Sequence, residues 1–252
     1  MYEHVVKKMT LLIDNSNTRT KLMFSCDGYL REERLVLPTE TLKADSLLQA
    51  IHGFEPEHVL VASVVPRCAE EIRQAFGDKV VFVGSKSVLN FELDYPGAVT
   101  LGADRIANVA GMVQLGHVPG VAVDMGTATT FDVVLPGGRG ARFVGGTIAP
   151  GLPALTQYLS CGTAQLPKVE LSATPRAIGR NTVEAIQGGC LLGYCGLVRG
   201  ILSSVQQELG YKPYVVATGG DAEFLSTYLP EIDVVDPLLT FRGLNALASL
   251  LF

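Results

Sequence analysis

Two stretches of the sequence decide the fold. Residues 11–24 read LLIDNSNTRTKLMF, and residues 121–134 read VAVDMGTATTFDVV. Each passes from an apolar segment through an aspartate into a short polar turn, and then into a second apolar segment. Asp14 aligns with Asp124, and Ser16 aligns with Gly126. Turn residues between two β-rich segments indicate a hairpin, so the same hairpin occurring twice predicts two similar lobes that arose by duplication.

Similar elements follow each hairpin. In the first half we expect strands at 30–37, 58–65 and 79–84 and helices at 39–51, 66–76 and 101–115. In the second half we expect strands at 142–148, 214–217 and 232–235 and helices at 151–159, 181–209, 221–229 and 240–252. Three strands followed by alternating helices and strands predict an α/β fold with a mixed sheet in each lobe. The boundary falls near 116–120, which gives lobes of residues 1–117 and 118–252.

The composition is that of an ordinary globular protein. Hydrophobic residues make up 48% of the 252 residues and charged residues 18%, with a formal net charge of −5. No basic face is expected, so nucleic acid is not an expected partner. The five cysteines are an odd number without zinc-ligand spacing, which favours reduced core thiols. Because residues 1–9 lack an apolar signal core and no apolar run is expected to span a membrane, we predict a cytoplasmic protein.

The first hairpin turn, residues 14–21, carries groups that suit a nucleotide triphosphate. The Asp14 carboxylate can hold Mg²⁺, usually through water, and Lys21 adds a positive charge. The small and hydroxyl side chains between them let the turn approach phosphates. A polar hairpin favours the same residue types without any ligand, however, so this turn alone leaves both readings open.

The second turn, residues 124–130, has a glycine among three threonines directly after a buried segment and Asp124. This pattern again suits a phosphate or a cation, although threonine is also common in ordinary strands. Two such turns, one from each lobe, favour a nucleotide held from both sides.

Asp104 is the candidate catalytic carboxylate. It lies in the tract Leu101–Arg105, which opens an apolar helix, and phosphoryl transfer often uses a carboxylate near the attacking hydroxyl. Arg105 can hold an anionic acceptor or the transferring phosphoryl group. An aspartate in a first helical turn also complements the helix dipole, and in isolation this is the favoured explanation of Asp104.

Three glycine-containing tracts have both structural and functional explanations. Residues 179–184 read GRNTVE, in which Asn181 and Glu184 have capping-box spacing and Thr182 can reach a ligand. Residues 216–221 read VATGGD, a strand entering a turn that either accommodates a flat ring or is a plain connection. Four glycines lie on one face of the expected helix at 181–209, namely Gly189, Gly193, Gly196 and Gly200. This row favours a dimer contact over packing within the lobe.

Together these residues resemble type III pantothenate kinase, a family of the actin, sugar-kinase and heat-shock ATPase superfold. The resemblance covers nearly the whole chain after Met9 and is carried by ordered motifs. These are Asp14, Asn17, Thr18 and Lys21; Tyr95 and Pro96 followed by Gly102–Arg105; Asp124–Thr130; residues 145–151; and residues 179–185. It implies two lobes similar to ribonuclease H, each with a mixed sheet and helices.

The resemblance also implies the function and the site. The expected reaction is ATP-dependent phosphorylation of pantothenate to 4′-phosphopantothenate, the first step of coenzyme A synthesis, with Asp104 accepting the proton of the hydroxyl. The residues implied to bind ATP are Asp14, Asn15, Ser16, Asn17, Thr18, Arg19, Thr20, Lys21 and Thr127. Those implied to bind pantothenate are Tyr95, Gly102, Ala103, Asp104, Arg105 and Thr182.

The implied ions and partners complete this expectation. Asp124 is expected to bind a monovalent cation, K⁺ or NH₄⁺, and Mg²⁺ accompanies ATP at Asp14. The family forms homodimers with the acceptor site near the subunit contact.

One residue departs from the family pattern. Ser16 stands where the family has glycine, so its side chain would crowd a phosphate, or force a different turn if φ is positive there, unless it donates a hydrogen bond instead. Two alternatives to pantothenate kinase remain at this point. One is a kinase-like regulatory protein with weak catalysis, and the other is a kinase of another small alcohol.

Overall fold

The computed structural model describes residues 9–171 and 175–252 and divides into two compact units. Unit 1 comprises Met1–Val118, Val134–Val144 and Leu238–Phe252, and unit 2 comprises Pro119–Val133 and Gly145–Pro237. This division differs from lobes of 1–117 and 118–252, because two later segments belong to unit 1. One is the outer part of a long hairpin and the other is the last helix, which packs against a helix of unit 1.

Unit 1 contains a five-stranded mixed sheet in the order β3-β2-β1-β4-β5. The antiparallel part comprises β1 (Met9–Asn15), β2 (Arg19–Cys26) and β3 (Tyr29–Pro38), and the parallel part adds β4 (His58–Ser63) and β5 (Val80–Phe82). Between β3 and β5 the chain forms α1 (Ala44–Ala50) and α2 (Pro66–Phe76). Pro66 begins α2 as expected, because its missing N–H is not needed in a first helical turn.

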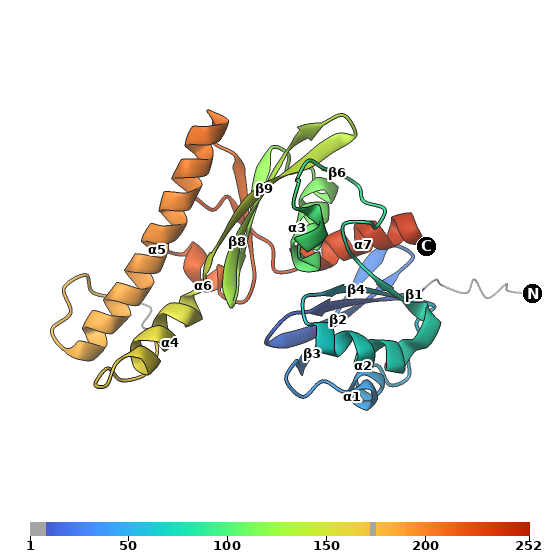
Figure 1. Cartoon of the computed structure of the whole chain (residues 1–252), viewed down its shortest axis with the longest axis horizontal. Helices are drawn as coiled ribbons and strands as arrows, with labels where there is room; N and C mark the ends of the chain where they lie inside the picture. The colour runs from blue at the N-terminus through green and yellow to red at the C-terminus, as the bar shows by residue number, and fades with distance from the viewer. Residues whose placement is uncertain (1–8, 172–174) are drawn as a thin grey trace, which may run out of the picture. The chain divides into compact units, whose positions relative to one another are not determined.

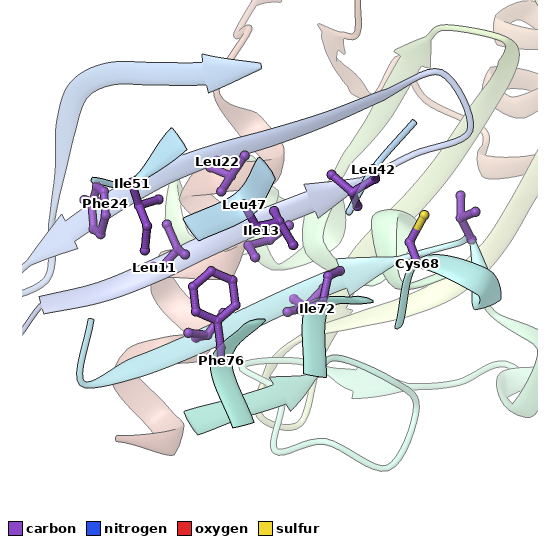
Figure 2. Close-up of a cluster of buried hydrophobic side chains, with 13 residues drawn as sticks. Leu11, Ile13, Leu22, Phe24, Leu42, Leu47, Ile51, Cys68, Ile72 and Phe76 are labelled. Carbon is purple, nitrogen blue, oxygen red and sulfur yellow. The ribbon is translucent and has the colours of Figure 1, made fainter. Parts of the chain in front are cut away.

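One face of this sheet packs against α1 and α2. Figure 2 shows the core between them, in which Leu11 and Ile13 of β1 meet Leu47 of α1 and Ile72 of α2. Because side chains alternate along a strand, Leu12 and Asp14 must point to the opposite face.

That opposite face is covered by α3 (Ala103–Gln114) and α7 (Leu239–Leu251), both of which contact β4. The two helices cross closely: a Cβ added at Gly243 would lie 1.7 Å from the carbonyl oxygen of Ala107. The hydroxyl of Thr240 also donates a buried 2.8 Å hydrogen bond to Oδ1 of Asn108. The polar end of β1, at Asp14, therefore lies on the side of the sheet that carries α3.

A second sheet repeats this strand order. The second sheet has the order β11-β10-β7-β8-β9-β6, with β7 (Gly120–Met125), β8 (Ala128–Gly137) and β9 (Gly140–Pro150) following one another along the chain. Then β10 (Tyr214–Thr218) pairs in parallel with β7, and β11 (Val234–Val235) with β10. The order β9-β8-β7-β10-β11 matches β3-β2-β1-β4-β5, which agrees with the duplication expected from the two hairpins. The helices of unit 2, labelled in Figure 1, are α4 (Leu152–Gly162), α5 (Thr182–Leu209) and α6 (Ala222–Ser226).

Three short elements lie outside the predicted ones. The two-residue strand β6 (Glu92–Leu93) pairs in parallel with β9, and 3₁₀ turns occur at η1 (Gly77–Lys79) and η2 (Ala98–Thr100). They are too short to produce a periodic pattern, so the sequence does not reveal them.

Two expectations, one about apolar segments and one about the cysteines, need correction. We expected no apolar run of membrane-spanning length, but α5 meets the length and composition of a membrane span. A core helix of a soluble protein meets the same test, and 44% of the apolar window in α5 is buried. The cysteines are not all core thiols either, because Cys161 is exposed on α4.

Candidate active site

Asp14 is the penultimate residue of β1 and is almost fully buried, with 5% of its surface exposed. The antiparallel register places Lys21 of β2 directly opposite, and Nζ of Lys21 lies 2.8 Å from Oδ2 of Asp14. Lys21 is only half-buried. The hairpin therefore presents a neutralised carboxylate–ammonium pair at its turn end.

The turn itself accommodates Ser16 without strain. Its backbone N–H donates to the carbonyl oxygen of Arg19 at 3.2 Å, and its hydroxyl donates to the same oxygen at 2.9 Å. Among the described non-glycine residues only Asp27 has a positive φ, so Ser16 does not need the left-handed conformation that favours glycine. Ser16 therefore does not force a different turn through a positive φ, and its hydroxyl does donate a hydrogen bond. Crowding of a phosphate by its side chain stays a prediction.

A buried chain of side-chain hydrogen bonds supports this turn. Ser63 donates to Oδ1 of Asn15 at 2.6 Å, and Nδ2 of Asn15 donates to Oγ1 of Thr20 at 2.8 Å. Thr20 lies 2.9 Å from the hydroxyl of Thr39, which donates to the carbonyl oxygen of Ser16 at 2.8 Å. The side chains of Asn15 and Thr20 are thus used inside the protein.

These hydrogen bonds divide the predicted ATP-binding residues into two groups. Asn17, Thr18 and Arg19 are exposed, whereas Asn15 and Thr20 are buried. Sequence reasoning missed Thr39 and Ser63. The only available signal was a hydroxyl residue at the end of each neighbouring strand.

Asp104 occupies the first turn of α3, where its Oδ1 accepts a 2.8 Å hydrogen bond from the backbone N–H of Arg105. The carboxylate folds back over Gly102, since a Cβ added there would lie 2.4 Å from Oδ1 of Asp104. A larger residue at position 102 would therefore require the Asp104 carboxylate to move.

Burial raises the pKa of Asp104, and the negative charge of Asp14 raises this pKa further, although the hydrogen bond from Arg105 opposes both. Two predicted site residues from separate parts of the sequence therefore interact electrostatically within unit 1. A carboxyl with a raised pKa is better matched to accepting a proton near neutral pH than an ordinary aspartate is.

Two further residues predicted to bind pantothenate, Tyr95 and Arg105, both contact Phe143 of β9. The ring of Tyr95 packs edge-on against Phe143, with centroids 5.4 Å apart. The guanidinium carbon of Arg105, which is buried, lies 5.5 Å from the centroid of the same ring. Phe143 was not identified from the sequence, because a buried phenylalanine in a strand gives no sign of a functional contact.

In unit 2, the second hairpin turn is closely packed on its backbone. Asp124 and Met125 end β7, and a Cβ added at Gly219 would lie 2.6 Å from Oδ1 of Asp124. Gly219 has a φ of +97°, so this position requires glycine for both reasons. Gly151 plays a similar role on the other side, where a Cβ would lie 2.0 Å from the carbonyl oxygen of Gly126.

Tyr194 of α5 lies beneath this turn. Its fully buried hydroxyl is 2.6 Å from Oγ1 of Thr129. Burial raises the pKa of Tyr194 to about 12, and the charges of Asp221 and Asp124 contribute in the same direction. Tyr194 therefore stays neutral and anchors α5 to β8, while Thr127 at the tip of the turn is exposed.

Thr182 is the first residue of α5 and is exposed. Asn181 caps the helix by accepting a 2.9 Å hydrogen bond from the N–H of Glu184. The Glu184 carboxylate reaches back to the N–H of Arg180 at 2.9 Å, rather than to that of Asn181 as in a standard capping box. Capping thus explains Asn181 and Glu184 and leaves Thr182 available.

The predicted site residues fall into two groups. Unit 1 holds Asp14–Lys21, Tyr95 and Gly102–Arg105, and unit 2 holds Asp124, Thr127 and Thr182. Within residues 9–171 and 175–252 there is no cluster of three or more His, Cys, Asp or Glu that could hold a metal ion. A Mg²⁺ that enters with a nucleotide does not require one, because phosphates and waters supply most of its ligands.

Comparison with solved structures identifies the fold. A Campylobacter jejuni protein named for the Baf family of transcriptional activators superimposes with a TM-score of 0.64 at 22% identity, covering 95% of this chain and 97% of that one. A ROK family glucokinase from Streptomyces griseus, solved with glucose and AMPPNP, gives a TM-score of 0.53 at 14% identity, with 96% and 98% covered. The chain has the fold shared by actin-like ATPases and sugar kinases, as expected.

Comparison of sequences identifies the family. The model of the type III pantothenate kinase family matches residues 10–204. The type III pantothenate kinase of Akkermansia muciniphila is 43% identical over 240 residues, covering 95% of this chain and 98% of the relative. That of Methylacidiphilum infernorum is 35% identical over 243 residues, covering 96% and 88%. The chain belongs to the type III pantothenate kinase family.

Proposed function

We propose that this protein transfers the γ-phosphoryl group of ATP to the primary hydroxyl of pantothenate. The product is 4′-phosphopantothenate, the first intermediate of coenzyme A synthesis, and the enzyme works in the cytoplasm. The observation that carries the proposal is the half-buried Asp104 in the first turn of α3, whose pKa is raised and which interacts electrostatically with Asp14 in a member of this family.

Asp104 is the proposed general base. It takes the proton of the pantothenate hydroxyl as that oxygen forms its bond to the γ-phosphorus, while the bond from this phosphorus to the β-γ bridging oxygen breaks and ADP leaves. Such a transfer depends mainly on positioning and charge neutralisation. Tyr95, Arg105 and the backbone at Gly102 and Ala103 hold the acceptor, with Thr182 as a further contact.

The first hairpin turn is the proposed ATP site. Its exposed residues Asn17, Thr18 and Arg19 would contact the nucleotide, as would Ser16 and Lys21. Thr127, which is exposed in unit 2, is likewise proposed to bind ATP. Asn15 and Thr20 act from beneath through the buried hydrogen bonds described above.

Two ions accompany this proposal. Mg²⁺ would be held near Asp14, usually through water, and would neutralise phosphate charge. Asp124, near the end of β7, would hold K⁺ or NH₄⁺ through its carboxylate, the role that the resemblance of residues 124–130 to the family motif implies. Turnover should therefore be higher in KCl than in NaCl of equal ionic strength, and equal rates in the two salts would remove the monovalent site.

A homodimer is part of the proposal. Within residues 9–171 and 175–252, a Cβ added at any of four α5 glycines meets no atom within 4 Å outside its own helix backbone, so packing among these residues does not explain them; the four are Gly189, Gly193, Gly196 and Gly200. Thr182 lies seven residues before Gly189 and so shares this helical face. The open face suits close approach of a second copy of the chain.

The test is product identification. The purified protein is incubated with MgATP and K⁺ and with pantothenate, glucose or glycerol, and products are analysed by mass spectrometry. We expect 4′-phosphopantothenate and no comparable sugar or glycerol phosphate. Preferential phosphorylation of another alcohol would indicate a different kinase, and absence of any ATP-dependent product would favour a regulatory protein.

A further inference from the structure

Phe143 lies at the point where two separate parts of the acceptor motif meet. It belongs to β9 and is fully buried, with 0% of its surface exposed. Its ring contacts Tyr95 edge-on at 5.4 Å and lies 5.5 Å from the guanidinium carbon of Arg105. All three residues belong to unit 1.

The backbone of Phe143 also holds the segment that carries Tyr95. Leu93 of β6 pairs with Phe143, and the N–H of Asp94 donates a 3.0 Å hydrogen bond to the carbonyl oxygen of Phe143. Next to it, Nη1 of Arg142 lies 2.6 Å from Oδ2 of Asp94. Because β6 has only two residues, the placement of Tyr95 depends on these contacts with β9 rather than on a strand of its own.

The Arg105 side chain also contacts Phe143. Its guanidinium is buried near an aromatic face, where a cation is attracted by the ring electrons and the contact is stronger than at an exposed site. The ring thus restrains Arg105 of α3 and Tyr95 of the β6–η2 segment at the same time.

We propose that Phe143 is a positioning residue of the acceptor site, which orients Tyr95 and Arg105 to receive the pantothenate carboxylate and hydroxyls. This inference rests on the proposed function. Phe143 acts through its two neighbours, because its own ring has no exposed surface with which to touch a substrate.

The test separates acceptor binding from ATP binding. Phe143→Leu removes the ring but keeps an apolar side chain, whereas Phe143→Tyr keeps the ring. The matched control is Phe24→Leu, which removes another buried ring of unit 1 that has an aromatic neighbour, Phe54, at 4.9 Å. Phe24 lies on β2 opposite Leu11, away from the turn end of that hairpin.

Steady-state kinetics are measured for each variant with pantothenate and ATP varied in turn. We expect Phe143→Leu to raise the KM for pantothenate about tenfold, the size expected from losing one aromatic and one cation–π contact. The KM for ATP should stay within about twofold, and Phe143→Tyr should remain near wild type because the ring contacts persist. Phe24→Leu should lower the melting temperature without changing either KM.

Equal increases in both KM values, or a Phe143→Leu variant that behaves like Phe24→Leu, would overturn the inference. If Phe143→Leu does not fold, Phe143→Met replaces it, with the same expected split between the two KM values. Failure of the proposed function gives a different result, since the wild-type protein itself would then not phosphorylate pantothenate.

Discussion

The raised pKa of Asp104 suits a proton acceptor, but it also lowers the stability of the folded protein at neutral pH. Burial and the charge of Asp14 raise its pKa in the folded protein, whereas an unfolded aspartate titrates at about 3.9. As pH rises through the window between these two pKa values, the unfolded chain loses this proton before the folded one does. The free energy of unfolding therefore falls across that window, and the loss persists at neutral pH.

Asp104→Asn should therefore be more stable than wild type at pH 7, and this gain should vanish below about pH 4, where both states are protonated. The measurement is urea denaturation at several pH values. Asp78→Asn, an exposed position in η1, is the control and should change little. A destabilised Asp104→Asn at pH 7 would contradict the assigned pKa direction.

Thr39 is the residue that fixes the first turn. Its hydroxyl contacts Thr20 and the carbonyl oxygen of Ser16, and its N–H donates to the carbonyl oxygen of Thr18. Thr39→Val keeps the shape but removes the hydroxyl, which leaves buried polar groups without that partner. We expect the KM for ATP to rise about fivefold, from a loss of about 1 kcal/mol.

Thr39→Ser restores the hydroxyl and should return the KM for ATP to near the wild-type value. Thr10→Val, at the opposite end of β1, is the matched control and should leave that KM unchanged. A Thr39→Val enzyme with wild-type ATP kinetics would show that the turn holds its shape without this hydrogen bond.

At the scale of elements, the close crossing of α3 and α7 fixes the position of α3, which contains Asp104. Gly243→Ala should destabilise the protein by about 2 kcal/mol, since overpacking of this kind outweighs the better helix propensity of alanine. Thermal or urea denaturation measures the change. Ser249→Ala, exposed on the same helix, should stay within about 0.5 kcal/mol. Equal stability of Gly243→Ala and Ser249→Ala would mean that the crossing is looser than described.

Most elements could be predicted from the sequence because they are long and periodic. The helix from Pro66 to Phe76 was predicted at both ends, since Pro66 marks its start. By contrast, α1 begins at Ala44 rather than near Thr39, because Thr39 forms hydrogen bonds to the hairpin turn instead of entering a helix. Contacts between distant segments, such as the pairing of β6 with β9, could not be predicted because they produce no pattern in the local sequence.

The candidate site was predictable in its motifs but not in its supporting residues. Their local contexts made Asp14 and Asp104 candidates only, and the resemblance to the ordered family motifs selected them. The two residues interact electrostatically within unit 1. Thr39, Ser63 and Phe143 were not identified, because hydroxyl and aromatic residues in strands or directly after them are also common as ordinary core residues.

At the scale of the whole molecule, the open glycine face of α5 predicts an interface. A Cβ added at Gly196 meets no atom of the described residues within 4 Å outside its own helix backbone, so Gly196→Glu would place its charge in a close contact with a second copy. We expect the wild type to be a dimer and Gly196→Glu a folded monomer by light scattering after size-exclusion chromatography. Gln206→Glu, exposed on another side of α5, should remain dimeric. A dimeric Gly196→Glu variant would place the interface elsewhere.

The central claim is that Asp104 accepts the proton of the pantothenate hydroxyl. The most direct measurement is the rate of MgATP-dependent pantothenate phosphorylation by wild type and Asp104→Asn, together with pantothenate affinity by calorimetry. We predict that kcat falls at least a hundredfold in Asp104→Asn, as general bases commonly contribute that much or more, while pantothenate still binds. A variant that turns over at the wild-type rate would contradict the account.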